Sequence, residues 1–211
     1  MKSIPVLIIG KSGTGKSTSL RNFKKEDISL VNPLAKRLPF KSELNDNYLA
    51  TDDYEKIKTF IQKTPKNIIV IDDIGYLLTN EFMRRAKETG YGKFTDIALH
   101  FYELIEFIKN LDGDKRVYMI MHEEKNEVGD VAPKTVGKLL DSQVCIEGLF
   151  TIVLRAMCDN GNFIFRTKTT GQDVTKAPMG MFEQEQIDND LKLVDNAICE
   201  YYEIKNESEE K

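Results

Sequence analysis

The most constraining feature of this chain is a glycine-rich segment near its N-terminus. An apolar run over residues 4–9 leads into residues 10–17, which read Gly-Lys-Ser-Gly-Thr-Gly-Lys-Ser. These residues match the pattern G-x-x-x-x-G-K-[ST], in which successive backbone N–H groups point into one concavity and hold the phosphates of a nucleotide. The apolar run is predicted to be a strand and residues 16–24 a helix, whose N-terminus also attracts an anion. The segment therefore predicts a nucleotide-binding α/β fold.

Each residue type in this loop has a physical role. Gly10, Gly13 and Gly15 are expected to let the backbone turn with positive φ. Lys16 is predicted to reach the β- and γ-phosphates, and the Ser17 hydroxyl to ligate Mg²⁺. The candidate nucleotide-binding residues are Gly10, Lys11, Ser12, Gly13, Thr14, Gly15, Lys16, Ser17 and Thr18. We expect ATP and Mg²⁺ as the ligands.

Composition limits the remaining classes of protein. With 211 residues the chain is long enough for one well-buried α/β domain, and its formal net charge of −4 gives no overall attraction to nucleic acid. No apolar run approaches the roughly 20 residues that cross a bilayer, and a strand beginning at residue 4 leaves no room for a signal peptide. Cys145, Cys158 and Cys199 lack metal-ligand spacing, so we expect a cytoplasmic protein with reduced thiols and no membrane contact.

Strand-like and helix-like segments alternate through the first 121 residues. Further strands are predicted at residues 28–31, 68–71 and 116–121, and helices at 52–61 and 95–110. The first of these helices is expected to be capped by Thr51 or Asp52. Such alternation favours a mainly parallel sheet flanked by helices, with right-handed connections.

The order of elements changes in the C-terminal third. Asn160-Gly161 lies between two strand-like runs, residues 150–157 and 162–168, and this dipeptide is a strong signal for an antiparallel hairpin. A helix is predicted over residues 184–203. We expect one domain over residues 1–204 and a flexible acidic tail over 205–211.

An acidic pair follows the apolar run at residues 68–71. Asp72 is expected at the C-terminal end of this strand, beside the phosphate loop, where a carboxylate holds Mg²⁺ directly or through water. Asp73 either polarises the attacking water or caps a helix that begins near Ile74-Gly75. His122 follows the strand over 116–121; it either senses the γ-phosphate or is a histidine satisfied at a strand edge. These residues predict a hydrolytic site beside the loop.

Two hydrophilic segments are candidates for contact with single-stranded DNA. Residues 84–94 combine four cations with two aromatic rings, which suits phosphate contact and base stacking, and residues 123–138 carry further lysines. The alternative is that both are solvated surface segments. The candidate contacts are Arg84, Arg85, Lys87, Lys93, Lys134 and Lys138.

A pair of cations lies on the second strand of the predicted hairpin. Arg166 and Lys168 are two residues apart and are therefore expected on one face of the strand. Cations placed this way can be delivered across a subunit boundary to the γ-phosphate of a neighbour, as arginine fingers are. The alternative is a solvent-facing strand with no catalytic role.

The loop at residues 10–17, the apolar run with its acids at 68–73, the strand before His122 and the hairpin together resemble the RecA-like core ATPases. More narrowly, nearly the whole chain is similar to short phage-encoded P-loop NTPases of replication and recombination modules. The resemblance implies ATP hydrolysis with Mg²⁺, ring or filament assembly of identical subunits, and action on single-stranded DNA in the host cytoplasm. The candidate catalytic residues are then Lys16, Asp72, Asp73, His122, Arg166 and Lys168, and the candidate metal ligands are Ser17 and Asp72.

The chain departs from the RecA-like pattern at one important position. Enzymes of that type carry a catalytic glutamate just beyond the second strand, whereas this chain has Asn32-Pro33, with Glu43 as the next acid. Three alternatives follow: either Asp73 takes the role of this glutamate, or Glu43 folds back to the site, or hydrolysis is slow. Two other functions stay open: a helicase-loader-like AAA+ ATPase that binds a partner protein, favoured by the acidic pair, and a small-molecule kinase, which the hairpin disfavours.

Overall fold

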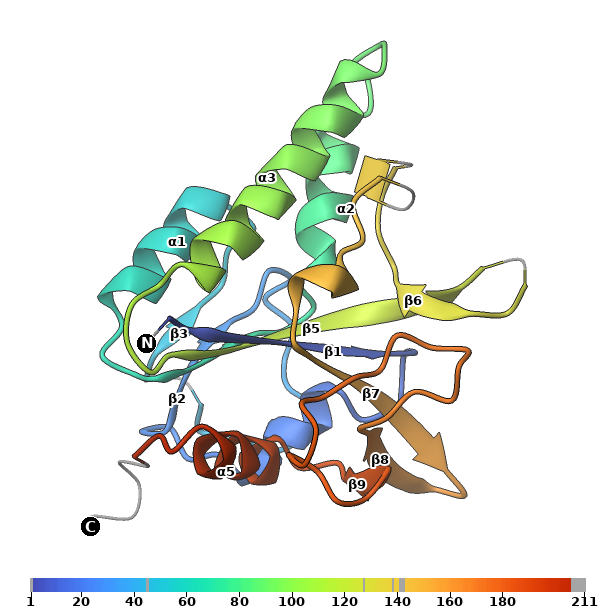
Figure 1. The fold of residues 1–211 in the computed structure, drawn as a ribbon. Coiled ribbons are helices and arrows are strands. Elements are labelled where there is room, and N and C mark those ends of the chain that lie inside the picture. Colours follow the sequence, from blue (N-terminus) through green and yellow to red (C-terminus); the bar gives the residue numbers. More distant parts are fainter. Residues whose placement is uncertain (1, 45, 127, 138, 141–142, 206–211) are drawn as a thin grey trace.

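A β-sheet with helices on both faces forms the centre of the molecule (Figure 1). The structure is a computed structural model that describes residues 2–44, 46–126, 128–137, 139–140 and 143–205. Residues 206–211 of the expected tail, and Lys138 of the second basic segment, lie outside the described residues.

Nine strands of the described part of the chain belong to this sheet. They are β1 Ile4–Gly10, β2 Ile28–Val31, β3 Tyr48–Leu49, β4 Ile68–Ile71, β5 Arg116–Lys125, β6 Val131–Pro133, β7 Ile152–Asp159, β8 Asn162–Arg166 and β9 Gln186–Asp188. Their order is β3-β2-β4-β5-β1-β7-β8-β9, with β6 paired to β5. The strands from β3 to β7 in this order run parallel, and β6, β8 and β9 pair antiparallel. The predicted mainly parallel α/β arrangement is confirmed.

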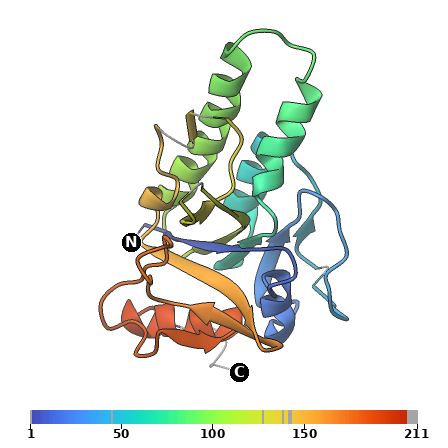
Figure 2. The same ribbon diagram turned by 90° about the vertical axis from the view of Figure 1, so that its right-hand side faces the viewer.

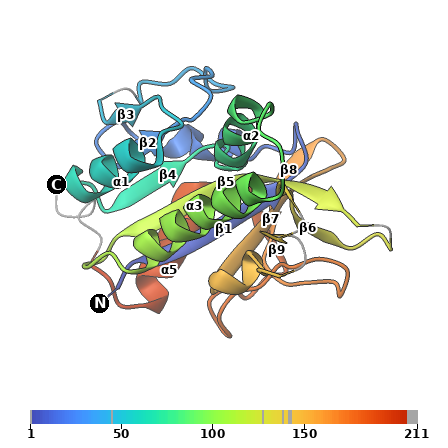
Figure 3. The same cartoon turned by 90° about the horizontal axis from the view of Figure 1, so that it is seen from above.

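Helices cover the two faces of the sheet unequally (Figures 1 and 3). The helical elements are η1 Ser17–Asn22, α1 Tyr54–Lys63, α2 Gly75–Arg84, α3 Gly92–Lys109, η2 Glu147–Leu149 and α5 Leu191–Tyr201. The helices α1, α2 and α3 lie on one face, and η1 and α5 lie on the other. Among the described helices, none combines the length and apolar character needed to cross a membrane.

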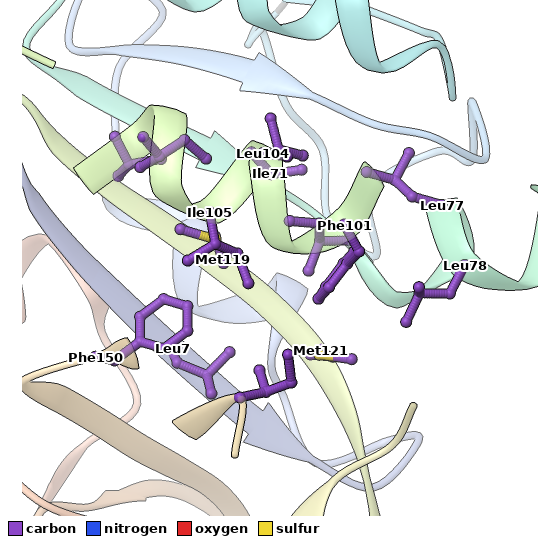
Figure 4. Close-up of a cluster of buried hydrophobic side chains, with 14 of the residues drawn as sticks. Leu7, Ile71, Leu77, Leu78, Phe101, Leu104, Ile105, Met119, Met121 and Phe150 are labelled. Carbon is purple, nitrogen blue, oxygen red and sulfur yellow. The ribbon is translucent and has the colours of Figure 1, made fainter. Parts of the chain in front are cut away.

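The apolar runs of the sequence become strands that are buried on both sides. Leu104 and Ile105 of α3 pack with Ile71 and Met119 above the sheet (Figure 4), and Val70 packs in the separate cluster below it. A strand covered on both faces needs apolar side chains at every position rather than alternation. This explains why β4 is a continuous run of isoleucine and valine.

The register of the central strands determines which side chains meet at the sheet edge. The strand β5 lies between β1 and β4, with Gly10 opposite His122 and Ile71 opposite Met119. Because these strands are parallel, their C-terminal ends emerge at the same edge. The residues that follow β1, β4 and the middle of β5 are therefore neighbours although they are far apart in sequence.

The predicted hairpin is also confirmed. Asn160 and Gly161 have φ of 49° and 85° and connect β7 to β8. Positive φ at both central residues is the requirement of a type I′ turn, whose twist matches that of two antiparallel strands. The hairpin extends the parallel sheet beyond β7.

Several predicted boundaries are wrong. The segment after the phosphate loop is a short 3₁₀ helix rather than an α-helix, and α1 is capped by Asp53, whose carboxylate accepts hydrogen bonds from the N–H groups of Glu55 and Lys56. The strand predicted to end at residue 121 continues to Lys125, because its last residues pair with β6. The C-terminal helix begins only at Leu191, since β9 pairs with β8 and takes the preceding residues. For β5 and for the start of α5, pairing with another strand overrides the local pattern.

The two basic segments are more ordered than their composition predicts. Residues 85–91 connect α2 to α3 at the end of a helix pair that projects away from the sheet (Figures 1 and 2). The second segment is largely an antiparallel ribbon formed by the end of β5 and by β6. This ribbon, unlike the α2–α3 connection, continues directly from His122, the residue of β5 that lies opposite Gly10.

Candidate functional site

The glycines of the phosphate loop serve two different purposes. Gly13 and Gly15 have φ of 79° and 84°, as predicted, but Gly10 is not among the residues with positive φ, so that part of the prediction is wrong. A Cβ atom on Gly10 would lie 2.7 Å from the carbonyl oxygen of Ala156 in β7 and 2.7 Å from the Thr14 hydroxyl. Gly10 is therefore required by close backbone approach and not by its own dihedral angles.

Lys16 lies across the inside of this loop. Its ammonium group donates hydrogen bonds to the carbonyl oxygens of Gly10, at 2.9 Å, and Lys11, at 2.8 Å. The residue is buried, and burial lowers its pKa against the opposing effect of Asp73 and Asp72. Lys11 and Ser12 are exposed at the tip of the loop, where Thr14 donates a 2.8 Å hydrogen bond to the Lys11 carbonyl. The loop thus holds one cation inside and leaves its tip open to solvent.

The structure brings Ser17 and Asp72 together although 55 positions separate them in the sequence. The Ser17 hydroxyl donates a 2.9 Å hydrogen bond to Asp72 Oδ1, and the Asp72 residue is 5% exposed. Burial, with a contribution from neighbouring Asp73, raises the pKa of Asp72 to about 6. Mg²⁺ prefers oxygen ligands and is usually held by one or two protein groups together with phosphates and waters. The pair fits that requirement, although the described residues contain no cluster of three or more His, Cys, Asp or Glu side chains that could hold a metal by themselves.

Asp73 is held in an unusual backbone conformation beside this pair. Its φ is 60°, which is uncommon for a residue other than glycine, and the residue is buried. Its carboxylate accepts a 2.6 Å hydrogen bond from Lys36 and lies 3.5 Å from Nε2 of His122. The helix α2 begins after Ile74 with no side-chain cap, so the alternative in which Asp73 caps this helix is wrong. In this conformation the carboxylate instead lies next to Lys36 and His122.

His122 lies within β5 rather than after it. Its ring packs edge-on against Tyr76, with ring centroids 6.1 Å apart, and its carbonyl accepts a 2.8 Å hydrogen bond from the N–H of Lys134. Burial, followed by the charge of Lys16, lowers the pKa of His122. It lies opposite Gly10 and 3.5 Å from Asp73, and its contact with a γ-phosphate stays a prediction. It also connects the site to the β5–β6 ribbon.

Lys36 is a site residue that the sequence reasoning missed. It follows β2, at the place where only a carboxylate was sought, and its ammonium group lies 5.5 Å from the centre of the Tyr76 ring. Burial opposes its charge, but the hydrogen bond to Asp73 and nearby negative charges outweigh that effect and raise the pKa of Lys36. A cation five residues after the end of a parallel strand was the available signal. Glu43, the other candidate base, is exposed and lines a separate hollow with Phe40.

The cations predicted to contact DNA are mostly engaged in intramolecular contacts. Arg84 pairs with Asp52, Arg85 pairs with Glu88 and Asp96, and Lys93 donates a 2.8 Å hydrogen bond to the Glu88 carbonyl. All three lie on the α2–α3 projection, far along the chain from the phosphate loop. Lys87 and Lys134 are exposed, and Lys134 is the one adjacent in the fold to His122.

The predicted finger residues separate in the structure. Arg166 is the last residue of β8 and lies opposite Arg155 of β7, and its Nε is buried without a hydrogen-bond partner among the described residues. Lys168 lies beyond the end of the strand, where it is exposed. The prediction that both cations lie on one face of the same strand is therefore wrong, because β8 ends at Arg166.

Comparisons with known proteins do not identify a family for this chain. No protein-family model matches the sequence, and a search of curated proteins returns no match. The chemistry of the site is therefore interpreted from its own residues and geometry.

Proposed function

We propose that this chain is a RecA-like ATPase that binds ATP with Mg²⁺, hydrolyses it and acts on single-stranded DNA. The observation that carries the proposal is the hydrogen bond between Ser17 and Asp72. It joins the end of the phosphate loop to the carboxylate after β4, and these are the two protein groups that hold Mg²⁺ in nucleotide hydrolases of this motif.

The order of the strands supports an ATPase of the RecA-like type. The strand β5 separates β1, which leads into the phosphate loop, from β4, which leads into the acidic pair. This separation leaves space at the sheet edge for a polar side chain from β5, and His122 fills it. A side chain in that place can respond to the presence of a terminal phosphate and pass the change along its own strand.

The side chains suggest how hydrolysis would proceed. Lys16 would exchange its contacts with the loop carbonyls for contacts with the β- and γ-phosphates. Mg²⁺, held by Ser17 and Asp72, would neutralise charge on those phosphates. Asp73 is the carboxylate that accepts a proton from the attacking water, because it lies next to Asp72 and is oriented by Lys36 and His122. Lys36 donates a 2.6 Å hydrogen bond to Asp73 and thereby fixes the position of its carboxylate.

The β5–β6 ribbon supports the proposed action on single-stranded DNA. It carries exposed Lys125 at its far end and exposed Lys134 beside His122. A polyanion bound along the ribbon would contact β5, the strand that carries His122 at the site. ATP turnover and DNA contact would then be coupled through β5.

The first test is ATP binding by the Lys16→Ala variant, measured with a fluorescent ATP analogue in the presence of Mg²⁺. Loss of a charge-assisted contact to phosphate should weaken binding by roughly 10- to 100-fold. Lys63→Ala, at the exposed end of α1, is the matched control and should bind as the unmodified protein does. ATP binding by Lys16→Ala at unchanged affinity would show that the site assignment is wrong.

The DNA part of the proposal has its own measurement. ATP turnover should rise when single-stranded DNA is added at low salt, and the rise should diminish as salt is increased. A protein that hydrolyses ATP but neither binds single-stranded DNA at low salt nor responds to it would contradict this part and leave the ATPase assignment intact.

A further inference from the structure

A buried amide lies beside the phosphate loop without a partner. Asn189, directly after β9, is 1% exposed, and neither its Nδ2 nor its Oδ1 has a hydrogen-bond partner among the described residues. Buried polar groups in native proteins are nearly always paired, because an unpaired one loses its hydration without compensation. An amide that is kept unpaired next to a ligand site is therefore a candidate to bind part of the ligand.

The backbone around Asn189 is fastened to the helix that follows the loop. The Arg21 guanidinium donates a hydrogen bond to the Asn189 carbonyl oxygen, and Asn22 donates one of 2.6 Å to the Asp190 carboxylate. These contacts join the β9–α5 connection to η1, and Figure 1 shows β8, β9 and α5 grouped around η1. The amide is thus held in a defined place and not on a mobile loop.

Phe163 of β8 meets the same point of the phosphate loop. A Cβ atom on Gly15 would lie 2.8 Å from the Phe163 ring and 3.1 Å from Asn189 Oδ1, so the ring and the amide are neighbours against Gly15. The Phe163 residue is 40% exposed. In the strand order, β8 lies on one side of β1, while β4 and the acidic pair lie on the other.

We propose that Phe163 and Asn189 form the site for the base of the bound nucleotide, and that this base is adenine. The proposal rests on the proposed nucleotide-binding function. A nucleotide whose γ-phosphate lies near Asp72 and Asp73 extends along the loop toward the opposite side of β1, which is where these two residues lie. An aromatic ring can stack on a planar base, and an amide can bind the polar edge of that base.

The chemistry of the amide favours adenine over guanine. An asparagine side chain offers one acceptor and one donor, and adenine presents the complementary pair, its N6 amino donor next to the N7 acceptor. Guanine presents two acceptors, O6 and N7, at the same edge. Rotation of the Phe163 ring away from Gly15 would uncover the amide for this contact.

The test compares the affinities of four Mg²⁺-bound compounds, measured by competition with a fluorescent ATP analogue. These are ATP, GTP, purine riboside triphosphate, which lacks the N6 amino group, and inorganic tripolyphosphate. The unmodified protein should bind ATP roughly 10-fold more tightly than GTP or purine riboside triphosphate. Asn189→Leu should bind all three nucleotides with similar affinity and tripolyphosphate as before. Phe163→Ala should bind every nucleotide more weakly, by roughly 5- to 100-fold, with tripolyphosphate again unchanged.

The tripolyphosphate arm separates the possible failures. Leu193→Ala, an exposed position on α5, is the control for disturbance of the C-terminal elements and should keep the preference for ATP. If the unmodified protein binds tripolyphosphate but does not distinguish the three nucleotides, or if Asn189→Leu retains the preference, the base site is wrong and the ATPase proposal stands. If the unmodified protein binds neither tripolyphosphate nor any nucleotide, the proposed function itself fails.

Discussion

Two adjacent carboxylates, Asp72 and Asp73, are buried at the edge of the sheet, and each accepts a hydrogen bond from a different side chain. Ser17 donates a hydrogen bond to Asp72, while Lys36 pairs with Asp73. Burial and the neighbouring carboxylate keep the pKa of Asp72 near 6, above the ordinary value of 3.8. An ionised Asp72 without a cation therefore destabilises the folded protein at neutral pH.

This leads to a prediction for stability in the absence of metal and nucleotide. The folded protein retains the Asp72 proton up to about pH 6, whereas the unfolded chain releases it near pH 3.8, so this group makes the fold less stable as pH rises between these values. Asp72→Asn should therefore raise the free energy of unfolding at pH 7.5 by up to about 3 kcal/mol, and by much less at pH 4. Denaturant unfolding in EDTA at both pH values measures the difference. Equal stability of the two proteins at pH 7.5 would contradict the assigned pKa.

At the scale of elements, the hairpin β7–β8 contributes to the phosphate loop as well as to the sheet. Ala156 of β7 packs against Gly10 at the start of the loop, and Phe163 of β8 packs against Gly15 near its end. The loop is therefore shaped from the C-terminal third of the chain as well as by its own glycines. Changes at the hairpin residues that contact the loop should consequently affect nucleotide binding.

Two glycine substitutions distinguish the contact of the hairpin with the phosphate loop from its place in the sheet. Gly10→Ala places a methyl group 2.7 Å from a backbone oxygen of β7, so the loop must shift and ATP binding should weaken by more than about 10-fold. Gly161→Ala, at the hairpin turn with φ of 85°, meets no atom within 4 Å, so it should cost only about 1 kcal/mol of stability and leave ATP affinity unchanged. ATP binding and denaturant unfolding of both variants measure this contrast. Normal binding by Gly10→Ala would show that the close approach to β7 is not required.

At the scale of the whole molecule, one buried ion pair fastens the last helix to the central sheet. The Asp195 carboxylate of α5 accepts two 2.9 Å hydrogen bonds from Arg116 and one of 2.6 Å from the Tyr118 hydroxyl. These contacts lie at the beginning of β5, and the phosphate loop lies at the opposite end of the sheet. A change at the ion pair should therefore alter the stability of the fold without altering nucleotide binding at the opposite end of the sheet.

Asp195→Ala should reveal that separation. Removing one partner leaves the Arg116 charge buried without compensation, which should lower the free energy of unfolding by about 3 to 5 kcal/mol, while the folded fraction binds ATP as before. Asp112→Ala, which breaks the exposed pair with Lys2, is the control and should have a far smaller effect. Denaturant unfolding combined with ATP titration provides the readout. A similar loss of stability in both variants would contradict a special role for the buried pair.

Local patterns in the sequence were sufficient to predict much of the fold and the residues at the centre of the site. The phosphate loop, the apolar strand before Asp72 and the Asn160-Gly161 turn are each encoded within a few consecutive residues, because glycine geometry, burial on both faces and turn conformation act locally. The mainly parallel sheet followed from the alternation of these elements.

Contacts between distant segments were decided only by the tertiary structure. The sequence by itself determined that a phosphate loop and a strand ending in two acids exist in this chain. The sheet order then placed Ser17 against Asp72, Lys36 against Asp73, and Phe163 and Asn189 against Gly15. The physical reason is that these contacts depend on which strands become neighbours and in what register. That choice is made by packing and strand pairing across the whole molecule, and no single segment encodes it.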